Sequence, residues 1–189
     1  MSSPIGHSFA GYIINAYSIR SLKIQDIKTL FLCIFIANAP DLDFVPGLLF
    51  GKPNLFHHGI SHSIGMGAIF SLLLASLLNI GDTEKLNKDF FLFFSLYCSH
   101  LLLDYISYDG RPPIGIPIFW PLSNEYFIFK YPILPPVAHS GLTHATIAQF
   151  FNGVFSIHNL YVVLMEFAVS LPLLLIVWIL NLNRSRNTN

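Results

Sequence analysis

The stretch FFLFFSLYCSHLLLD, residues 90–104, is almost wholly apolar until it reaches a histidine and an aspartate. With the two residues that follow, it approaches the roughly 20 apolar residues that a helix needs to span a bilayer. His100 and Asp104 are four residues apart, so on a helix their side chains share one face. Such a pair could grip one divalent ion or simply share a hydrogen bond. Because ionisable groups are costly within a span, we predict a membrane helix whose polar pair faces a partner or a cavity.

The composition of the whole chain indicates a membrane protein. Of its 189 residues, 53% are hydrophobic and 11% are charged, which is about half the charged fraction of a soluble domain. The formal net charge is zero with neutral histidines, so no nucleic-acid partner is predicted. Both cysteines lie in apolar runs, and we expect buried thiols rather than a disulfide or a cysteine zinc site. The length predicts a single integral membrane domain over residues 1–189.

Other apolar segments predict an all-α, multi-pass membrane bundle of about four to five helices. Residues 60–80 and 160–180 are long enough to span alone, whereas residues 29–39 need help from residues 44–50. Residues 5–19 form a shorter segment, which either spans or lies in the membrane interface. The sequence leaves these two arrangements of the first helix open.

Residues 107–158 differ from the rest of the chain. They contain seven of the twelve prolines, with aromatic residues between them. Proline at this density prevents a continuous helix. Because the segment is too apolar for a disordered linker, we predict an ordered, proline- and aromatic-rich loop at the non-cytoplasmic face.

The lysines and arginines indicate the orientation. If the first helix spans, seven of them lie on one side of the membrane and three on the other, and the richer side is expected to be cytoplasmic. Alternation of the helices then brings the unusual polar residues together at the opposite face. These are His7, Asp41, Asp43, His57, His62, His100, Asp104, His139 and His144. Several histidines and carboxylates at one face predict a divalent metal site.

A repeated hexapeptide supplies four of these histidines, as HHGISH at residues 57–62 and HSGLTH at residues 139–144. Ser61 and Thr143 are good N-cap residues, and each precedes an apolar run. We therefore expect each copy to join a loop to a helix. Each would contribute one histidine from the loop and one from the first turn of the helix. The alternative is that both copies only cap helices. His58 is a weaker ligand candidate than the other histidines of the first copy.

Three further polar features need a role or a partner. The PDLD sequence at residues 40–43 places two carboxylates two residues apart, so one could bind metal while the other orients a ligand or activates water. A solvated loop is the alternative reading of this sequence. Glu166 lies inside the last span and needs an internal partner, for which we favour a hydrogen bond within the bundle. His158, at the start of that span, is expected to be interfacial.

These motifs together resemble the YdjM-like family of LexA-regulated, membrane-bound metal-dependent hydrolases. The resemblance rests on PDLD, on HHGISHS at residues 57–63 against the family's H-R-G-x-T-H-S, on HLLLD at 100–104, on FWPLS at 119–123 and on the early His7. His58 stands where the family usually has arginine. The family is similar to the zinc-dependent phospholipase C and single-strand nuclease group, whose all-α fold binds several zinc ions. Here Ala148 stands where that group's second motif has an acid, which implies one or two zinc ions rather than three.

The resemblance implies a hydrolase of the bacterial inner membrane that uses Zn²⁺ at the non-cytoplasmic face. Its substrate would be a phosphoester or related ester, either a small molecule or derived from the surrounding membrane lipids. The expected ligands are His57, His62, His100 and Asp104, completed by His7, His139 and His144, with Asp41 and Asp43 as candidate catalytic bases. Two alternatives remain, namely a metal-binding or transport protein without hydrolysis and a scaffold whose motifs only cap helices. The oligomeric state is left open.

Overall fold

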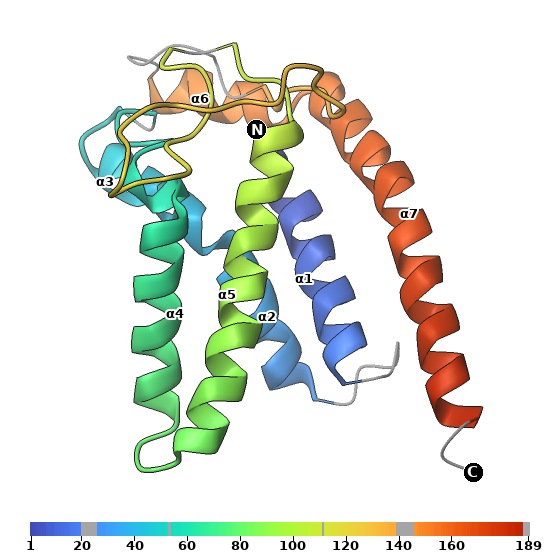
Figure 1. Cartoon of the computed structure of the whole chain (residues 1–189). Helices are drawn as coiled ribbons and strands as arrows, with labels where there is room; N and C mark the ends of the chain where they lie inside the picture. The colour runs from blue at the N-terminus through green and yellow to red at the C-terminus, as the bar shows by residue number, and fades with distance from the viewer. Residues whose placement is uncertain (20–25, 53, 111, 139–145, 187–189) are drawn as a thin grey trace.

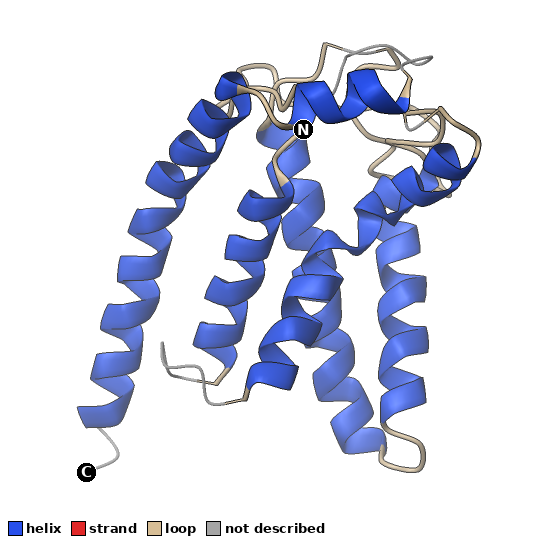
Figure 2. Cartoon of the chain, turned by 180° about the vertical axis from the view of Figure 1, so that it is seen from behind, coloured by secondary structure: helices blue, strands red, loops and turns tan. Residues whose placement is uncertain are grey.

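The computed structural model describes residues 1–19, 26–52, 54–110, 112–138 and 146–186. Within them, the regular secondary structure is helical (Figures 1 and 2). The longer helices are α1 (Pro4–Ser18), α2 (Ile27–Asn38), α4 (Ile64–Leu78), α5 (Thr83–Ile106) and α7 (Ile157–Arg186). The short helices α3 (Phe44–Leu49) and α6 (Ile147–Val154) lie at one end, with the loop of residues 107–138. We call this end of the bundle the loop end. The predicted all-α bundle is confirmed.

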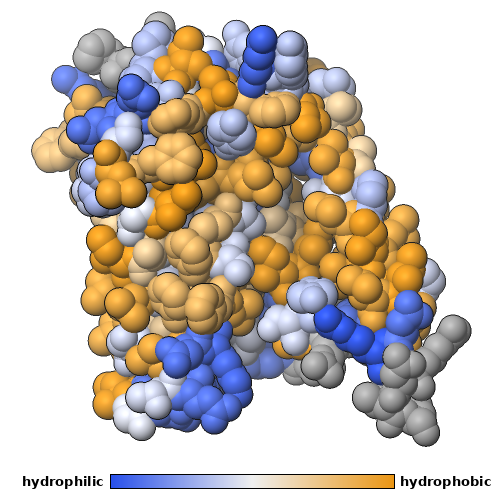
Figure 3. Space-filling view, viewed as in Figure 1, coloured by the Kyte–Doolittle hydropathy of each residue, from blue (hydrophilic) through white to orange (hydrophobic). Residues whose placement is uncertain are grey.

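Three helical segments among the described residues are long and apolar enough to cross a membrane. They are Ile27–Leu49, which runs from α2 through α3, Thr83–Ile106 and Ile157–Arg184. Figure 3 shows the broad apolar surface that the bundle presents, with hydrophilic side chains at its lower edge. Such a surface suits a protein whose helices face lipid.

The predicted span at residues 60–80 is wrong in its bounds. The first residues form the 3-10 helix η2 (Ile60–His62), and Ser63 then adopts an extended backbone. The side chain of Ser63 accepts a hydrogen bond from the Met66 amide, so Ser63, rather than Ser61, is the N-cap of α4. The remaining α4 has 15 residues, fewer than the roughly 20 of an ordinary span. The hydroxyl of Ser61 is thereby left available for other partners.

Small residues let the long helices approach closely. A Cβ atom on Gly11 of α1 would lie 3.1 Å from the Ala37 Cβ of α2. A Cβ on Gly67 of α4 would lie only 2.8 Å from the Tyr97 ring of α5. The Tyr97 hydroxyl also donates to the Ser61 carbonyl at 2.6 Å. Close packing between α4 and α5 thus fixes the position of η2.

The loop predicted for residues 107–158 is shorter in the structure, because α6 and the start of α7 lie within that range; its described part, residues 107–110 and 112–138, covers the start of α4. The Ile118 carbonyl accepts from the Ile64 amide at 2.9 Å, and the Trp120 carbonyl accepts from the Gly65 amide at 3.2 Å. These bonds satisfy amides that a helix leaves unpaired at its N-terminus. The short helix α6, which was not predicted, has Thr146 as its N-cap, in a reciprocal capping box with Gln149. A capping box is a local sequence signal, so the start of this helix could have been predicted from the sequence.

Candidate metal centre

Four side chains from three elements converge at the loop end. Asp41 comes from the 3-10 helix η1 (Ala39–Asp43), His62 from η2, and His100 and Asp104 from the last turns of α5. The Nε2 atoms of His62 and His100 lie 3.2 Å apart. Asp104 Oδ2 lies 3.4 Å and 3.2 Å from these two nitrogens, and Asp41 Oδ1 lies 3.5 Å and 3.6 Å from them. The four residues form a buried His/Asp group that could hold a metal ion.

Five of the six distances between these donor atoms are close to the edge of a small tetrahedron, and all six are within 4.8 Å. A tetrahedral ion bound at about 2.0–2.1 Å, as zinc is by imidazole, has ligand atoms about 3.3–3.4 Å apart. The measured separations of 3.2–3.6 Å lie around that value. Both carboxylate oxygens of Asp41, and Oδ2 of Asp104, are buried without a hydrogen-bond partner. Unpaired buried carboxylate oxygens are costly, so the donor set fits a divalent cation.

The other nitrogen of each imidazole is held by a hydrogen bond. His100 Nδ1 donates to the Ala37 carbonyl at 2.9 Å, and His62 Nδ1 lies 3.2 Å from Asp43 Oδ2. Asp43 Oδ2 also accepts from the Ser61 hydroxyl at 2.8 Å. A hydrogen bond at Nδ1 fixes the tautomer that leaves a lone pair on Nε2, as is typical of metal-binding histidines. Asp43 is therefore placed to orient ligands.

Two more histidines of the first hexapeptide share this arrangement. His57 Nδ1 donates to Asp43 Oδ1 at 2.9 Å, and His58 Nδ1 lies 3.2 Å from Asp109 Oδ2. One donor atom from each of His57, His58 and His62 lies within 4.8 Å of the other two. The structure thus brings His58, the weaker candidate by sequence, into the cluster as a buried side chain.

The backbone explains why sequence reasoning undervalued His58. Its φ is +64°, and it is the only non-glycine residue with positive φ among those described. That conformation is uncommon and costs energy in a residue other than glycine. In this conformation the His58 side chain lies in the cluster, beside His57 and His62. Its partner Asp109 lies in the irregular loop, where spacing gives no signal for the pairing.

His7, a predicted ligand, lies beside the cluster. It lies in the first turns of α1 and is fully buried. Its ring stacks on the His100 ring with the centroids 3.6 Å apart. Its Nε2 lies 3.5 Å from Asp104 Oδ1. His7 is thus near enough either to bind a metal ion in the cluster or to hydrogen-bond the Asp104 carboxylate.

Burial and neighbouring carboxylates shift the pKa values of the loop histidines in opposite directions. Burial, followed by the positive charge of His58, holds the pKa of His57 well below its usual value. Burial also lowers the pKa of His58, although Asp109 opposes that effect. For His62, burial is outweighed by the negative charge of Asp43 and by the neighbouring carboxylates of Asp104 and Asp41, so its pKa lies well above the usual value. A metal ion would compete with a proton at His62.

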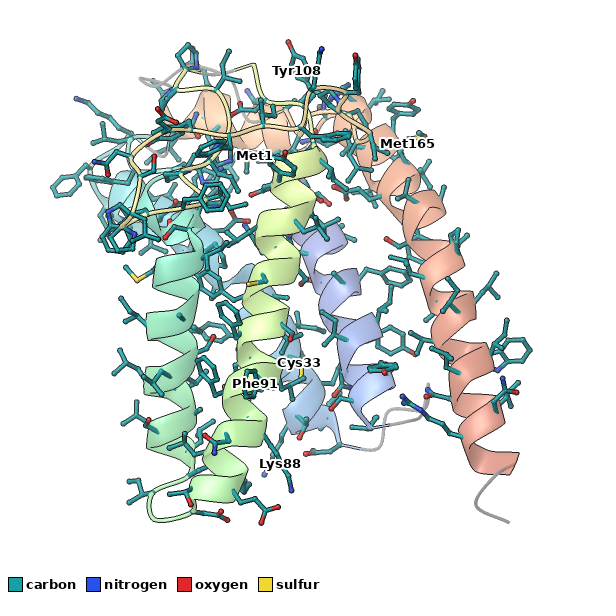
Figure 4. The ribbon with its side chains drawn as sticks, viewed as in Figure 1. Met1, Cys33, Lys88, Phe91, Tyr108 and Met165 are labelled. Atoms are coloured by element: carbon teal, nitrogen blue, oxygen red, sulfur yellow. The ribbon has the colours of Figure 1, made fainter. Side chains whose placement is uncertain are left out.

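Glu166 has the internal partners that its position required. Its carboxylate accepts from the Ser2 hydroxyl at 2.6 Å, from the Ser3 amide at 2.5 Å and from the Ser3 hydroxyl. The Ser2 amide in turn donates to Asp104 Oδ1 at 2.8 Å. Met1 lies beside the end of α5, where its amine donates to the Tyr108 carbonyl at 2.9 Å (Figure 4). Residues 1–3 therefore connect α7 to the aspartate of the cluster.

The remaining predicted residues fall outside the cluster or outside the described residues. His139 and His144, with Thr143 of the same hexapeptide, lie outside the described residues. His158 is exposed and donates from Nε2 to the Pro136 carbonyl at 2.8 Å. A hollow of about 350 Å³ opens beside the cluster. It is lined by Asp43, Pro46, Phe56, Gly59, Ile60, Ser61 and Met66.

The fold and the site together define a helical membrane protein with a buried His/Asp group able to hold a metal ion. The chain belongs to the YdjM family: the family model described as YdjM inner membrane protein matches residues 1–184. No curated protein and no solved structure matches the chain. The family identity agrees with the resemblance seen in the sequence and with the apolar helices.

Proposed function

We propose that this protein is a membrane-bound, metal-dependent hydrolase that uses Zn²⁺ to cleave a phosphoester or related ester. The observation that carries the proposal is the convergence of donor atoms from Asp41, His62, His100 and Asp104 within 4.8 Å of one another. A divalent ion held there would polarise a phosphoryl or acyl oxygen and lower the pKa of a bound water toward about 7.

The residues of the chain have separable roles in this proposal. Asp41, His62, His100 and Asp104 hold the ion, and Asp43 orients His57 and His62 through hydrogen bonds to Nδ1. Asp43 also lines the hollow of about 350 Å³ beside the cluster, where it could accept a proton from an attacking water. That volume is at the lower end of the range of small-molecule sites. It therefore suits a headgroup or a small ester, while any acyl chain of a lipid substrate stays in the bilayer.

The second candidate is a metal-binding or transport protein without turnover. Transport would favour polar groups distributed along the membrane-spanning helices. Among the described residues, however, the candidate donor groups lie together at the loop end, and Glu166 is already bonded to Ser2 and Ser3. This distribution favours a site at one membrane face over an ion path.

One experiment separates the two candidates. The protein is purified in detergent, its bound metal is measured, and hydrolysis of generic phosphodiester and carboxylic ester substrates is assayed. We expect bound zinc and turnover, both lost in His100→Ala and both kept in His158→Ala, a matched change at an exposed histidine. Bound metal without turnover on either substrate class would favour the binding protein. A wild-type protein free of metal would contradict both candidates.

A further inference from the structure

The helix α7 supplies no donor atom to the cluster among the described residues, but hydrogen bonds connect its Glu166 to one of the donors. We propose that Glu166 is a positioning residue for the metal centre. By fixing Ser2, it holds the Asp104 carboxylate in the orientation in which Oδ2 faces the histidines. The inference rests on the metal binding proposed above, but it does not depend on hydrolysis.

The first step is the division of the Asp104 carboxylate between two sides. Its Oδ2 lies 3.4 Å from His62 Nε2 and 3.2 Å from His100 Nε2, and it has no hydrogen-bond partner. Its Oδ1 accepts from the Ser2 amide at 2.8 Å. The terminal torsion of an aspartate is broad, so a partner on one oxygen determines where the other points. Hydrogen bonds of this kind orient carboxylates that bind metal.

The second step is the attachment of the Ser2 amide itself. The Glu166 carboxylate accepts from the Ser2 hydroxyl at 2.6 Å, from the Ser3 amide at 2.5 Å and from the Ser3 hydroxyl. Three hydrogen bonds to two successive residues leave the backbone between them little freedom. The contact is also close-packed, because a Cβ on Gly6 would lie 2.7 Å from both the Glu166 carboxylate and the Ser2 hydroxyl. All three side chains that form these bonds are buried, so water does not replace them.

The third step separates positioning from a merely structural contact. Ser2 takes part in both sets of hydrogen bonds, since its hydroxyl donates to Glu166 and its amide donates to Asp104. The other nearby donor is His7, whose Nε2 lies 3.5 Å from the same Asp104 oxygen. The Ser2 amide makes the shorter contact and is therefore the stronger constraint. A change at Glu166 should thus reach the metal through Ser2, in addition to loosening α7.

The test is the zinc affinity of the detergent-purified protein, measured by competition with a chromophoric chelator well below the melting temperature. We expect Glu166→Ala to weaken zinc binding by about 10- to 100-fold, the range known for loss of an orienting partner. Glu166→Gln has a carbonyl that can still accept from Ser2 and Ser3, and it should bind zinc as the wild type does. So should Glu125→Ala, a matched change at an exposed glutamate. Loss of stability alone would not change these affinities, because the chain stays folded at that temperature.

A second variant tests the route through Ser2. Ser2→Pro removes the N–H that Asp104 Oδ1 accepts, and it should weaken zinc binding to a similar extent. The double variant with Glu166→Ala should bind zinc no more weakly than the weaker single variant, because both changes act through one contact. Co²⁺ loaded in place of zinc reports the geometry of the ligands, and its visible absorption should change in both single variants but not in Glu125→Ala.

Each outcome decides for or against the role of Glu166. Unchanged zinc affinity in Glu166→Ala overturns the inference and leaves the metal centre standing. Losses that multiply in the double variant also overturn it, as does a Glu166→Gln variant that binds zinc as weakly as Glu166→Ala. If Glu166→Ala fails to fold, Glu166→Asp decides, since it keeps the charge but withdraws the carboxylate by one methylene and should weaken zinc binding. A wild type free of metal rejects the centre and the inference together. The expected affinities without turnover on any substrate would support the inference and reject the hydrolase.

Discussion

Asp104 is the residue at which most contacts of the centre meet. Its Oδ2 faces nitrogens of His62 and His100, and its Oδ1 accepts from the Ser2 amide. A carboxylate has two oxygens, so one can face the histidines while the other accepts from the Ser2 amide. A neutral side chain of the same shape lacks the charge that a cation requires. The position four residues after His100 makes this possible, because the helix stacks the two side chains on one face.

The histidines of the first hexapeptide predict an unusual dependence of stability on pH in the metal-free protein. The lowered pKa values of His57 and His58 mean that their contribution to the free energy of unfolding is lost at low pH and is complete above about pH 6.5. The raised pKa of His62 has the opposite sign: its contribution is present below about pH 6.5 and is lost as pH rises through the folded-state pKa.

We therefore expect the melting temperature of chelator-treated protein to rise toward about pH 6.5 and to fall on the alkaline side. Zinc-loaded protein should lack the alkaline fall, because the ion replaces the proton among the carboxylates. Scanning fluorimetry in detergent from about pH 5 to about pH 10 covers the range in which these histidines titrate. It measures the melting temperature against pH for the chelator-treated and the zinc-loaded protein. An alkaline fall that persists in His62→Gln would assign it to another group.

Much of the centre could be predicted at the level of single residues because regular elements carry it. His100 and Asp104 share a helical face by spacing alone, and alternation of the helices is enough to bring His7 and Asp41 to the same end. His58 could not be predicted, since its direction depends on a positive φ that ordinary propensities argue against. Its partner Asp109 lies in an irregular loop, where no periodicity relates the two residues.

The start of α4 is a feature that the apolar composition of the sequence does not predict correctly. The apolar run suggested a helix from residue 60, but the chain first forms η2 and begins α4 after Ser63. Serine occurs at both 61 and 63, so either could cap by propensity. The tertiary structure decides between them, because the Ser61 hydroxyl donates to Asp43 and its carbonyl accepts from Tyr97. The length of a helix at a functional site is thus set by its partners.

The buried carboxylate of Glu166 contributes to the attachment of α7 to the bundle. Removing it in Glu166→Ala leaves the hydroxyls of Ser2 and Ser3, and the Ser3 amide, without an acceptor, and we expect a loss of about 1–3 kcal/mol in the free energy of unfolding. For a chain of this size each kcal/mol lowers the melting temperature by about 2–4 °C. Thermal unfolding of the detergent-purified protein measures the effect.

Two comparisons make the Glu166 prediction specific. Glu125→Ala changes an exposed glutamate and should move stability by less than about 0.5 kcal/mol. Gly6→Ala approaches the same contact from α1, because a Cβ there would lie 2.7 Å from the Glu166 carboxylate. It should destabilise the protein as well. Equal melting temperatures for Glu166→Ala and Glu125→Ala would show that the contact contributes little.

At the scale of the whole molecule, the distribution of lysine and arginine leads us to propose that the loop end faces the non-cytoplasmic side. A cysteine-free background is made first, by replacing Cys33 and Cys98 with alanine. Leu122→Cys in the exposed loop should then react with a membrane-impermeant maleimide in intact cells, and Lys85→Cys at the other end only after permeabilisation. The reverse labelling pattern would place the centre on the cytoplasmic side.

The positions of the four donor residues in the sequence determine when, during synthesis, they can come together. Asp41 and His62 leave the ribosome well before His100 and Asp104, and the four donors adjoin only when α5 packs against α2 and α4. For the metal site that we propose, loading would therefore be a late event in biogenesis, after α5 has entered the bilayer. Nascent chains that stop before residue 100 would capture zinc no better than unstructured peptides. An ion bound there would act as a checkpoint for assembly, because only a correctly inserted bundle could retain it.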